Sequence, residues 1–247
     1  MKTITITARK GGDGKTTTAH TIAAGLARKG FKVLMLDLDS QANLTRRAGA
    51  SEEEKTICEA LRDPEALKDC IKHLKDYDII PGALDIVNLE RSATGTAADY
   101  LQIKQLLSRI KNKYDYCVID TSANIGIFTT AAIIAADKII IPLRLSADSV
   151  QGLQQLLEVV KQVNKRFEPV EVAGILPTQY KKRVVIDKIL ESLRAYADES
   201  RIKIYDYIRE CIAIQEAELL KVDLYEYAPK SNAAADYNKV IDDLMRA

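Results

Sequence analysis

Short apolar runs rich in β-branched residues recur along the chain, and a stretch with the apolar spacing of a helix follows most of them. The runs predict strands over residues 4–8, 32–37, 77–81, 116–120, 138–142 and 170–176. Helices are predicted over residues 15–29, 101–111, 125–136, 149–166, 183–196 and 233–245. This alternation predicts a doubly wound, mostly parallel sheet with helices on both faces, because parallel strands need crossover helices between them.

The remaining segments add little to this architecture. Residues 51–78 are charged and lack a clean strand, so we expect small surface helices there, with the acidic run 52–54 at a helix start. No Gly/Ser/Pro linker and no long repeat divides the chain. We therefore expect residues 1–247 to form a single domain, with no helix-turn-helix domain before it.

Composition and charge exclude several classes of protein. Apolar residues make up 47% of the chain and charged residues 29%, as in a globular protein with a sizeable core. The net charge of +1 excludes a globally basic nucleic-acid binder but not a local basic patch. Without any CxxC spacing among them, the cysteines argue against a zinc or iron–sulfur site. No apolar run approaches bilayer length, so we expect a cytoplasmic protein.

A glycine-rich segment lies between the first predicted strand and the first predicted helix. It reads Lys10-Gly11-Gly12-Asp13-Gly14-Lys15-Thr16-Thr17. Glycines let the backbone curl so that several N–H groups point at one anion, and the helix N-terminus adds its positive end. In a loop of this P-loop type, Lys15 reaches the β- and γ-phosphates of ATP and the Thr16 hydroxyl binds Mg²⁺. The segment therefore predicts an ATP-hydrolysing enzyme whose nucleotide-binding residues are 10–17.

The first lysine of this loop departs from the general pattern G-x-x-x-x-G-K-[ST], whose initial glycine is replaced here by Arg9. Lys10 can hardly reach the phosphates that Lys15 occupies, and is better placed for a nucleotide held by a second subunit. The motif resembles the deviant Walker A motif, K-G-G-x-G-K-[ST]-T, of the ParA/Soj/MinD family of partition and positioning ATPases. The resemblance implies a homodimer formed on ATP binding, in which Lys10 acts in trans much as an arginine finger does.

A second motif follows the strand predicted at 32–37. The sequence Asp37-Leu38-Asp39-Ser40-Gln41-Ala42-Asn43-Leu44-Thr45 is similar to the family pattern D-x-D-P-Q-x-N-x-T, with a serine in place of its proline. Both aspartates are expected at the carboxyl edge of the sheet, where ligands bind. By resemblance, Asp39 positions the attacking water and Asp37 lies near the Mg²⁺ shell.

A third motif ends the strand predicted at 116–120. Its terminal Asp120 fits a Walker B carboxylate, which holds Mg²⁺. The family continues with D-[TC]-P-P, whereas this chain continues with Thr121-Ser122-Ala123-Asn124. Without the two prolines, we expect this segment to be less rigid. Further along, Ile208 and Glu210 occupy the positions near the adenine where relatives carry proline and asparagine.

The resemblance to Soj-like proteins also implies nonspecific DNA binding by the ATP-bound dimer and a ParB-like protein that stimulates hydrolysis. Binding of this kind needs lysines and arginines facing phosphates. Arg183 best matches the family position, and Lys181, Lys182 and Arg209 are expected to extend the patch. The protein would then be associated with the nucleoid when it holds ATP.

Two alternatives stay open or can be weighed from the sequence. A MinD-like or cargo-positioning ATPase would act as a protein scaffold without DNA. Membrane attachment would need a carboxy-terminal helix with basic and bulky apolar faces, whereas residues 238–247 carry two adjacent acids and no aromatic side chain. We therefore predict a partition ATPase that does not bind membranes.

Overall fold

The computed structural model describes residues 1–246, apart from the side chain of Ala147. Its seven-stranded sheet comprises β1 (Lys2–Ile6), β2 (Val33–Leu38), β3 (Lys72–His73), β4 (Asp78–Ile80), β5 (Tyr116–Thr121), β6 (Lys138–Arg144) and β7 (Glu171–Thr178). The strands lie in the order β3-β4-β2-β5-β1-β6-β7, and all neighbouring pairs are parallel except β3 and β4. Strands β2, β5 and β1 therefore lie at the centre of the sheet.

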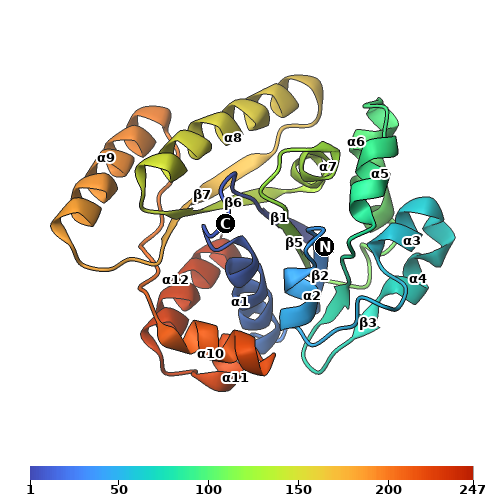
Figure 1. Ribbon diagram of the computed structural model, residues 1–247, viewed down its shortest axis with the longest axis horizontal. Helices are drawn as coiled ribbons and strands as arrows, with labels where there is room; N and C mark the ends of the chain where they lie inside the picture. The colour runs from blue at the N-terminus through green and yellow to red at the C-terminus, as the bar shows by residue number, and fades with distance from the viewer. Residues whose placement is uncertain (247) are drawn as a thin grey trace.

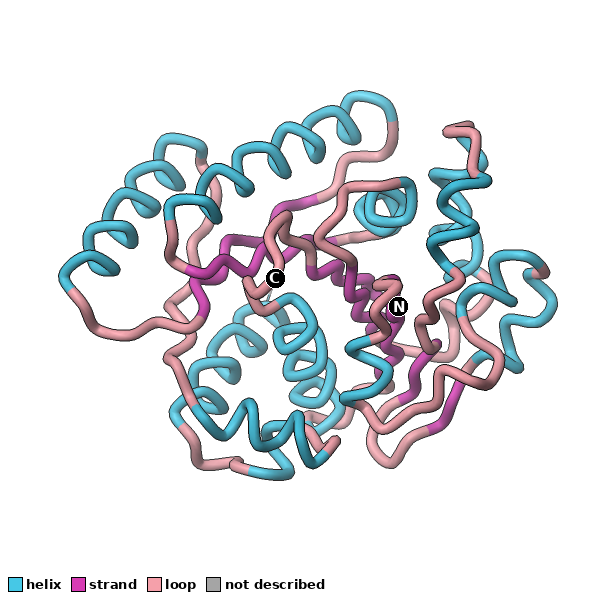
Figure 2. Tube along the Cα trace, in the orientation of Figure 1, coloured by secondary structure: helices cyan, strands magenta, loops and turns pink. Residues whose placement is uncertain are grey.

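Helices cover both faces of the sheet (Figures 1 and 2). One face carries α1 (Lys15–Arg28), α2 (Asn43–Arg47), α10 (Ile212–Leu220), α11 (Leu224–Tyr227) and α12 (Asn232–Arg246). The other carries α3 (Ile57–Arg62), α4 (Leu67–Cys70), α5 (Ile86–Ser92), α6 (Ala97–Ser108), α7 (Ile127–Ala135), α8 (Ala147–Arg166) and α9 (Val184–Ser200). The short 3-10 turn η1 (Pro64–Ala66) joins α3 to α4.

Alternating side chains of each central strand supply two separate cores. In β2, Val33 and Met35 pack beneath α1 and α12, whereas Leu34 and Leu36 pack under α3 to α7. This is the expected consequence of a strand whose successive side chains point to opposite faces. Both faces need apolar side chains, which explains why the strands read as nearly continuous apolar runs. The predicted doubly wound fold is confirmed.

Several element bounds differ from the prediction, and local contacts explain two of them. Helix α6 begins at Ala97 because Thr96 caps it: the Thr96 hydroxyl accepts from the Asp99 amide, and the Asp99 carboxylate accepts from the Thr96 amide. Residues 52–54 do not start a helix. Thr56 caps α3 instead, paired with Glu59 in the same reciprocal way. The sequence reading also missed α10 and the antiparallel edge strand β3. Among the described residues, no helix is both long and apolar enough to cross a membrane.

Candidate functional site

A cleft of about 490 Å³ opens at the carboxyl edge of the sheet. Its walls come from the segments that follow β1, β2, β5 and β7 and from the helices α10 and α12. This is the edge at which open α/β sheets bind ligands. The predicted nucleotide-binding residues that line the cleft are Gly11, Gly12, Gly14, Lys15, Thr16, Thr17, Ile208 and Glu210.

The glycine-rich loop has the backbone curvature that the sequence suggested. Gly12 and Gly14 have φ values of +83° and +90°, in the region that side chains with a Cβ rarely adopt. Gly14 directly precedes α1 and caps it without any side chain. The N-terminus of a buried helix therefore faces the cleft with amides free to bind an anion.

Lys15 lies in the first turn of α1 and is only 7% exposed. Its Nζ donates to the carbonyl oxygen of Lys10 at 3.3 Å, so the side chain folds back over the loop. Burial lowers the pKa of Lys15, while the carboxylates of Asp120, Asp39 and Asp13 oppose that shift. These three carboxylates thus offset part of the cost of burying the Lys15 ammonium group.

Asp120 is the penultimate residue of β5, and its carboxylate is fully buried. Neither of its oxygens has a hydrogen-bond partner among the described residues. Burial is the main cause that raises the pKa of Asp120, and the neighbouring charge of Asp37 raises it further, while Thr16 and Lys15 lower it. An orphaned buried carboxylate is costly unless a cation or ligand satisfies it. Together with the Thr16 hydroxyl, it is the oxygen donor set that suits Mg²⁺.

Asp37 lies beside Asp120 on β2 but has a different set of contacts. Its Oδ1 accepts from the Asp39 amide at 3.0 Å, and its Oδ2 accepts from the amide and the hydroxyl of Thr45 at 2.9 and 2.7 Å. Both oxygens are thus used in holding the turn between β2 and α2. Asp37 therefore shapes this turn, and its expected place near the Mg²⁺ shell stays a prediction.

Asp39 stands at the mouth of the cleft, partly exposed. Its Oδ1 accepts from the amide of Gln41 at 2.9 Å, which fixes the carboxylate relative to the turn. The structure therefore brings Asp39, Lys15 and Asp120 to one site, since each carboxylate acts on the pKa of Lys15. A carboxylate held in this way can accept a hydrogen bond from a water molecule in the cleft.

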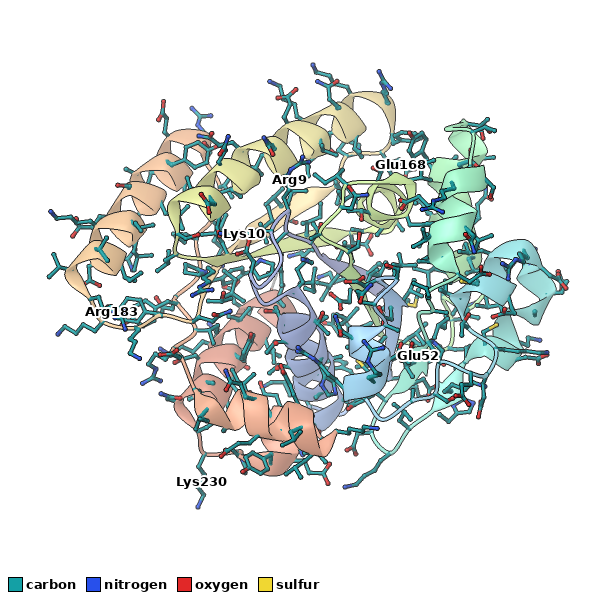
Figure 3. All side chains as sticks on the ribbon, viewed as in Figure 1. Arg9, Lys10, Glu52, Glu168, Arg183 and Lys230 are labelled. Atoms are coloured by element: carbon teal, nitrogen blue, oxygen red, sulfur yellow. The ribbon has the colours of Figure 1, made fainter. Side chains whose placement is uncertain are left out.

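Lys10 lies outside the cleft and is bound within its own subunit. Its Nζ is 3.1 Å from Asp148 Oδ2, in the first turn of α8, and 3.4 Å from the Oγ of Ser146, which caps that helix. Figure 3 shows Arg9 and Lys10 on the loop below α8. The Asp148 carboxylate is 82% exposed, so this ion pair is worth little and Lys10 can leave it at low cost.

Asp13 points away from the position of the phosphates. Its carboxylate is 3% exposed and accepts from the Ser149 hydroxyl at 2.9 Å and from the Arg144 amide at 3.4 Å. Burial raises the pKa of Asp13, and the Ser149 bond opposes this. The side chain therefore fastens the loop to the end of β6 and the first turn of α8, which leaves the backbone of Asp13 to contact a nucleotide.

The far end of the cleft contains the two predicted adenine neighbours. Ile208 is 2% exposed there, and Glu210 forms an ion pair with Lys181 at 3.0 Å. Between them, Arg209 donates from Nε and Nη2 to the Asp236 carboxylate at 2.8 and 2.7 Å. The Arg209 side chain is therefore held against α12.

The basic segment predicted to bind DNA precedes α9. A backbone bridge between Tyr180 and Arg209 places it alongside residues 207–210. With Lys181 and Arg209 paired, Lys182 and Arg183 are the exposed cations of this group that form no ion pair within the described part of the chain. Arg183 extends from the connection before α9 (Figure 3).

Sequence reasoning missed several residues of the site. Arg47 Nη1 donates to the Thr17 hydroxyl at 2.7 Å, and that hydroxyl donates to Glu218 Oε1 at 2.9 Å. This network joins α2 and α10 to the loop across one wall of the cleft. Gln179 and Ser149, which the sequence did not single out, also hold the site segments together, whereas Thr45, the last residue of the second motif, holds the turn after β2. No pattern in the sequence pairs residues so far apart, so no signal was available to find them.

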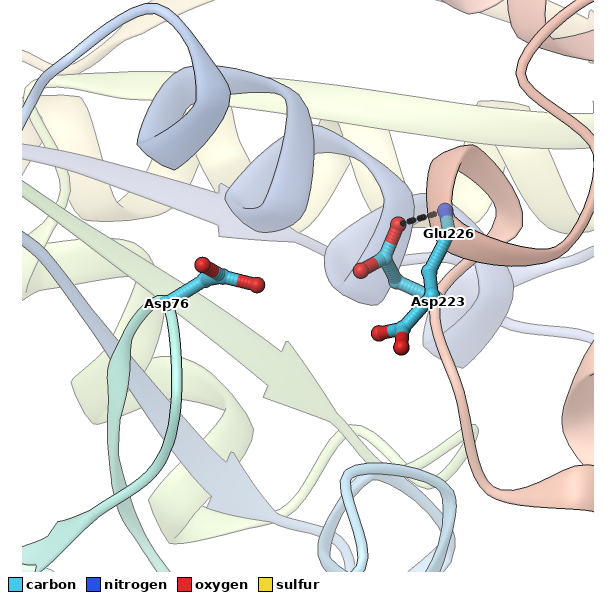
Figure 4. A group of neighbouring side chains, drawn as sticks. All are labelled: Asp76, Asp223 and Glu226. Carbon is cyan, nitrogen blue, oxygen red and sulfur yellow. Dashed lines mark hydrogen bonds between the residues drawn. The ribbon is translucent and has the colours of Figure 1, made fainter.

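A group of three carboxylates lies at another place in the molecule (Figure 4). Asp76, Asp223 and Glu226 come close enough to share a cation. Protein contacts account for two of them: Asp223 caps α11, with its Oδ1 3.7 Å from Arg28 Nε, and Glu226 Oε1 pairs with Lys75 Nζ at 3.4 Å. We therefore regard the group as structural.

Comparisons with known proteins bear on the family and the fold of the chain. The family model described as an AAA domain matches residues 1–171. The sporulation initiation inhibitor protein Soj of Bacillus subtilis is 31% identical, over 96% of this chain and 95% of its own. The structure of apo McdA from Cyanothece has a TM-score of 0.90 at 25% identity, covering 99% of both chains. The septum site-determining protein MinD of Pyrococcus horikoshii, solved with Mg-ADP, shares the fold with a TM-score of 0.82 at 23% identity, over 98% of this chain and 95% of that chain.

Proposed function

Because the chain belongs to the ParA/MinD family of P-loop ATPases, we propose that it is a partition ATPase that works as an ATP-dependent dimer. ATP would join two subunits face to face and complete a surface that binds DNA without sequence preference. Hydrolysis, stimulated by a ParB-like partner, would then separate the subunits. The family relation supports ATP hydrolysis in general, and the dimer and DNA steps are our proposal.

The observation that carries this proposal is the buried, unpartnered carboxylate of Asp120 beside Lys15 and Thr16. Asp120 and Thr16 would hold Mg²⁺, which supplies positive charge to the phosphates when it is bound. Lys15 would bind the β- and γ-phosphates, and the amides of residues 11–16 would bind the remaining phosphate oxygens. Asp39 would orient a water molecule toward the γ-phosphate. Within the dimer, Lys10 would exchange Asp148 for the partner's nucleotide.

DNA binding is proposed for Lys182 and Arg183, which carry free positive charge at the surface near the cleft. Contacts of this kind act on phosphates only, so affinity should fall steeply with salt and depend little on sequence. The ion pairs of Lys181 and Arg209 favour the second candidate, a positioning ATPase that forms the same dimer but carries a protein cargo without DNA. In either case the protein would act in the cytoplasm, and only the first would place it on the nucleoid.

Sedimentation of an Asp39→Ala variant tests the proposal directly. With ATP, this variant should accumulate as a dimer and cosediment with nonspecific duplex DNA at low salt. With ADP in place of ATP, it should not cosediment with DNA. A dimer that does not bind DNA would support the positioning ATPase. A variant that stays monomeric with ATP would contradict both candidates.

Charge reversal separates the proposed DNA contacts from general electrostatics. In the Asp39→Ala background, Arg183→Glu should weaken DNA binding about tenfold or more at low salt while leaving the dimer intact. Lys230→Glu makes the same charge change at an exposed position on the far side of α10 and α11 (Figure 3) and should have little effect. Equal losses in both variants would remove Arg183 from the binding surface.

A further inference from the structure

Gln179 directly follows β7 in an unusual backbone conformation. Its φ of +53° lies in the left-handed region, which residues other than glycine seldom occupy. Its neighbours hold it there: the Thr178 hydroxyl donates to the carbonyl of Asp13, and the Tyr180 amide donates to the carbonyl of Ile208, both at 2.9 Å. Strain of this kind persists only where surrounding contacts enforce it, and it is common at ligand-binding and switch segments.

The side chain of Gln179 reaches the phosphate-binding loop. Its Nε2 donates to the carbonyl oxygen of Gly12 at 2.7 Å. Gly12 itself has a φ of +83°, and a Cβ built on it would meet no heavy atom within 4 Å. When phosphates bind to the loop amides, the Gly12 carbonyl has to follow any rotation of the loop. A displacement of that carbonyl would pull on Gln179.

Gln179 also lies between two hollows of the surface. It lines the nucleotide cleft and a neighbouring hollow of about 400 Å³ whose cations are Lys10, Arg144, Lys181 and Arg183. Glu210 likewise lines both and holds Lys181. The proposed DNA-binding segment begins just after Gln179 in the chain, so a shift of residue 179 moves the start of that segment.

We propose that Gln179 is a positioning residue that couples the phosphate-binding loop to the basic segment 181–183. ATP in the cleft would fix the orientation of the Gly12 peptide group. The Gln179 side chain would transmit this change to the cations of residues 181–183. The DNA consequence rests on the proposed function, whereas the mechanical coupling does not. Two sites are coupled when binding at one changes the equilibrium at the other, and this is measurable without DNA.

Hydrogen exchange over residues 180–187 measures the coupling on the full chain. Wild type saturated with a nonhydrolysable ATP analogue should exchange more slowly in this segment than without nucleotide. In Gln179→Ala at the same saturation, that rate ratio should shrink about fivefold, equivalent to the loss of about 1 kcal/mol of coupling. Gln162→Ala removes an exposed glutamine from α8, where it contacts Glu158, and should match wild type.

Gln179→Gly guards against an artefact of backbone strain, because glycine tolerates the left-handed conformation and also lacks the amide donor. It should lose the coupling as the alanine variant does. The proposal is overturned if the segment in wild type does not respond to the analogue, or if either Gln179 variant responds as wild type does.

A DNA measurement then separates this inference from the proposed function. The ratio of DNA affinities with ATP and with ADP should fall about fivefold in Gln179→Ala. If wild type shows the exchange response but no DNA binding, the coupling stands and the partition role fails. If wild type binds DNA with ATP and the variants keep both ratios, the partition role stands and the coupling fails.

Discussion

Asp37 and Asp120 occupy paired positions of β2 and β5, both fully buried, yet of the two only Asp37 forms hydrogen bonds within the described part of the chain. The two neighbouring carboxylates therefore have different roles. Three hydrogen-bond donors hold Asp37 in the turn before α2, whereas both oxygens of Asp120 are available to a bound ion or ligand. Because each negative charge raises the cost of the other, the pair favours a bound cation.

Replacing each of the two aspartates should change stability in opposite directions. Burial raises the pKa of Asp120, so its ionised form opposes folding, and this cost grows as pH rises above the ordinary carboxyl range. At pH 7 and without nucleotide, Asp120→Asn should raise the free energy of unfolding by about 1–3 kcal/mol. It should also weaken Mg²⁺-dependent ATP binding. Asp37→Asn places an amide against three donors and should be destabilising. Urea unfolding of both variants checks this, and a destabilised Asp120→Asn would contradict our account.

Thr45 should stabilise the turn that carries Asp39. Its hydroxyl donates to Asp37 Oδ2 at 2.7 Å and accepts from the Gly82 amide at 2.9 Å, both buried. Thr45→Val keeps the shape but leaves that amide unpaired, so it should cost about 2 kcal/mol of unfolding free energy. Thr3→Val changes a buried strand threonine whose hydroxyl forms no hydrogen bond within the described part of the chain. It should cost far less unfolding free energy than Thr45→Val. Equal costs would show that the Thr45 bonds do not matter.

Lys15→Ala should weaken ATP binding strongly. Lys15 lies in the first turn of α1 at the cleft, and a charge-assisted phosphate contact is worth roughly 1.5–3 kcal/mol. Titration calorimetry should show at least a tenfold loss of affinity. Lys29→Ala, at the opposite end of α1, should bind ATP as wild type does. Retained binding in Lys15→Ala would argue against the cleft as the nucleotide site.

Lys10→Ala should separate ATP binding from dimerisation. The Lys10 side chain is bound to Asp148 outside the cleft, so its loss should leave ATP affinity within a few-fold of wild type. The dimer should be missing, because the cation that closes on the partner's nucleotide is gone. Analytical ultracentrifugation with ATP tests this against Arg9→Ala, which removes the neighbouring exposed charge. Normal dimers of Lys10→Ala would mean that the lysine has no role in trans.

His20 should account for part of the acid sensitivity of the fold. Its Nε2 meets the Tyr77 hydroxyl at 2.7 Å, and burial lowers the pKa of His20 to about 4 from an ordinary value of 6.5. The stabilisation is therefore complete above about pH 6.5 and is lost as pH falls toward 4. Between pH 7 and pH 5 wild type should lose about 2 kcal/mol through this group. Urea unfolding of His20→Gln at both pH values should show a correspondingly smaller loss; an unchanged loss would exclude His20.

Local patterns determined the fold class and the chemistry of the phosphate-binding loop. Continuous apolar strands separated by helical spacing left few options besides a doubly wound sheet, and α1 lies within a residue of its predicted bounds. The loop could be recognised because its glycines, its lysine and its threonine are adjacent in the chain. Asp120 was identifiable for a similar reason, since it ends an apolar strand.

Only the tertiary structure decided how these pieces are held and which way each charged side chain points. Asp13 turns to Ser149, Lys10 to Asp148 and Arg209 to Asp236, and Arg47 meets Glu218 through Thr17. Each of these contacts joins segments brought together by the order of strands in the sheet. A hydrogen bond acts over about 3 Å, so it depends on distances that chain separation does not reveal. Sequence therefore determined which groups are present, and packing determined which of them remain free for a ligand.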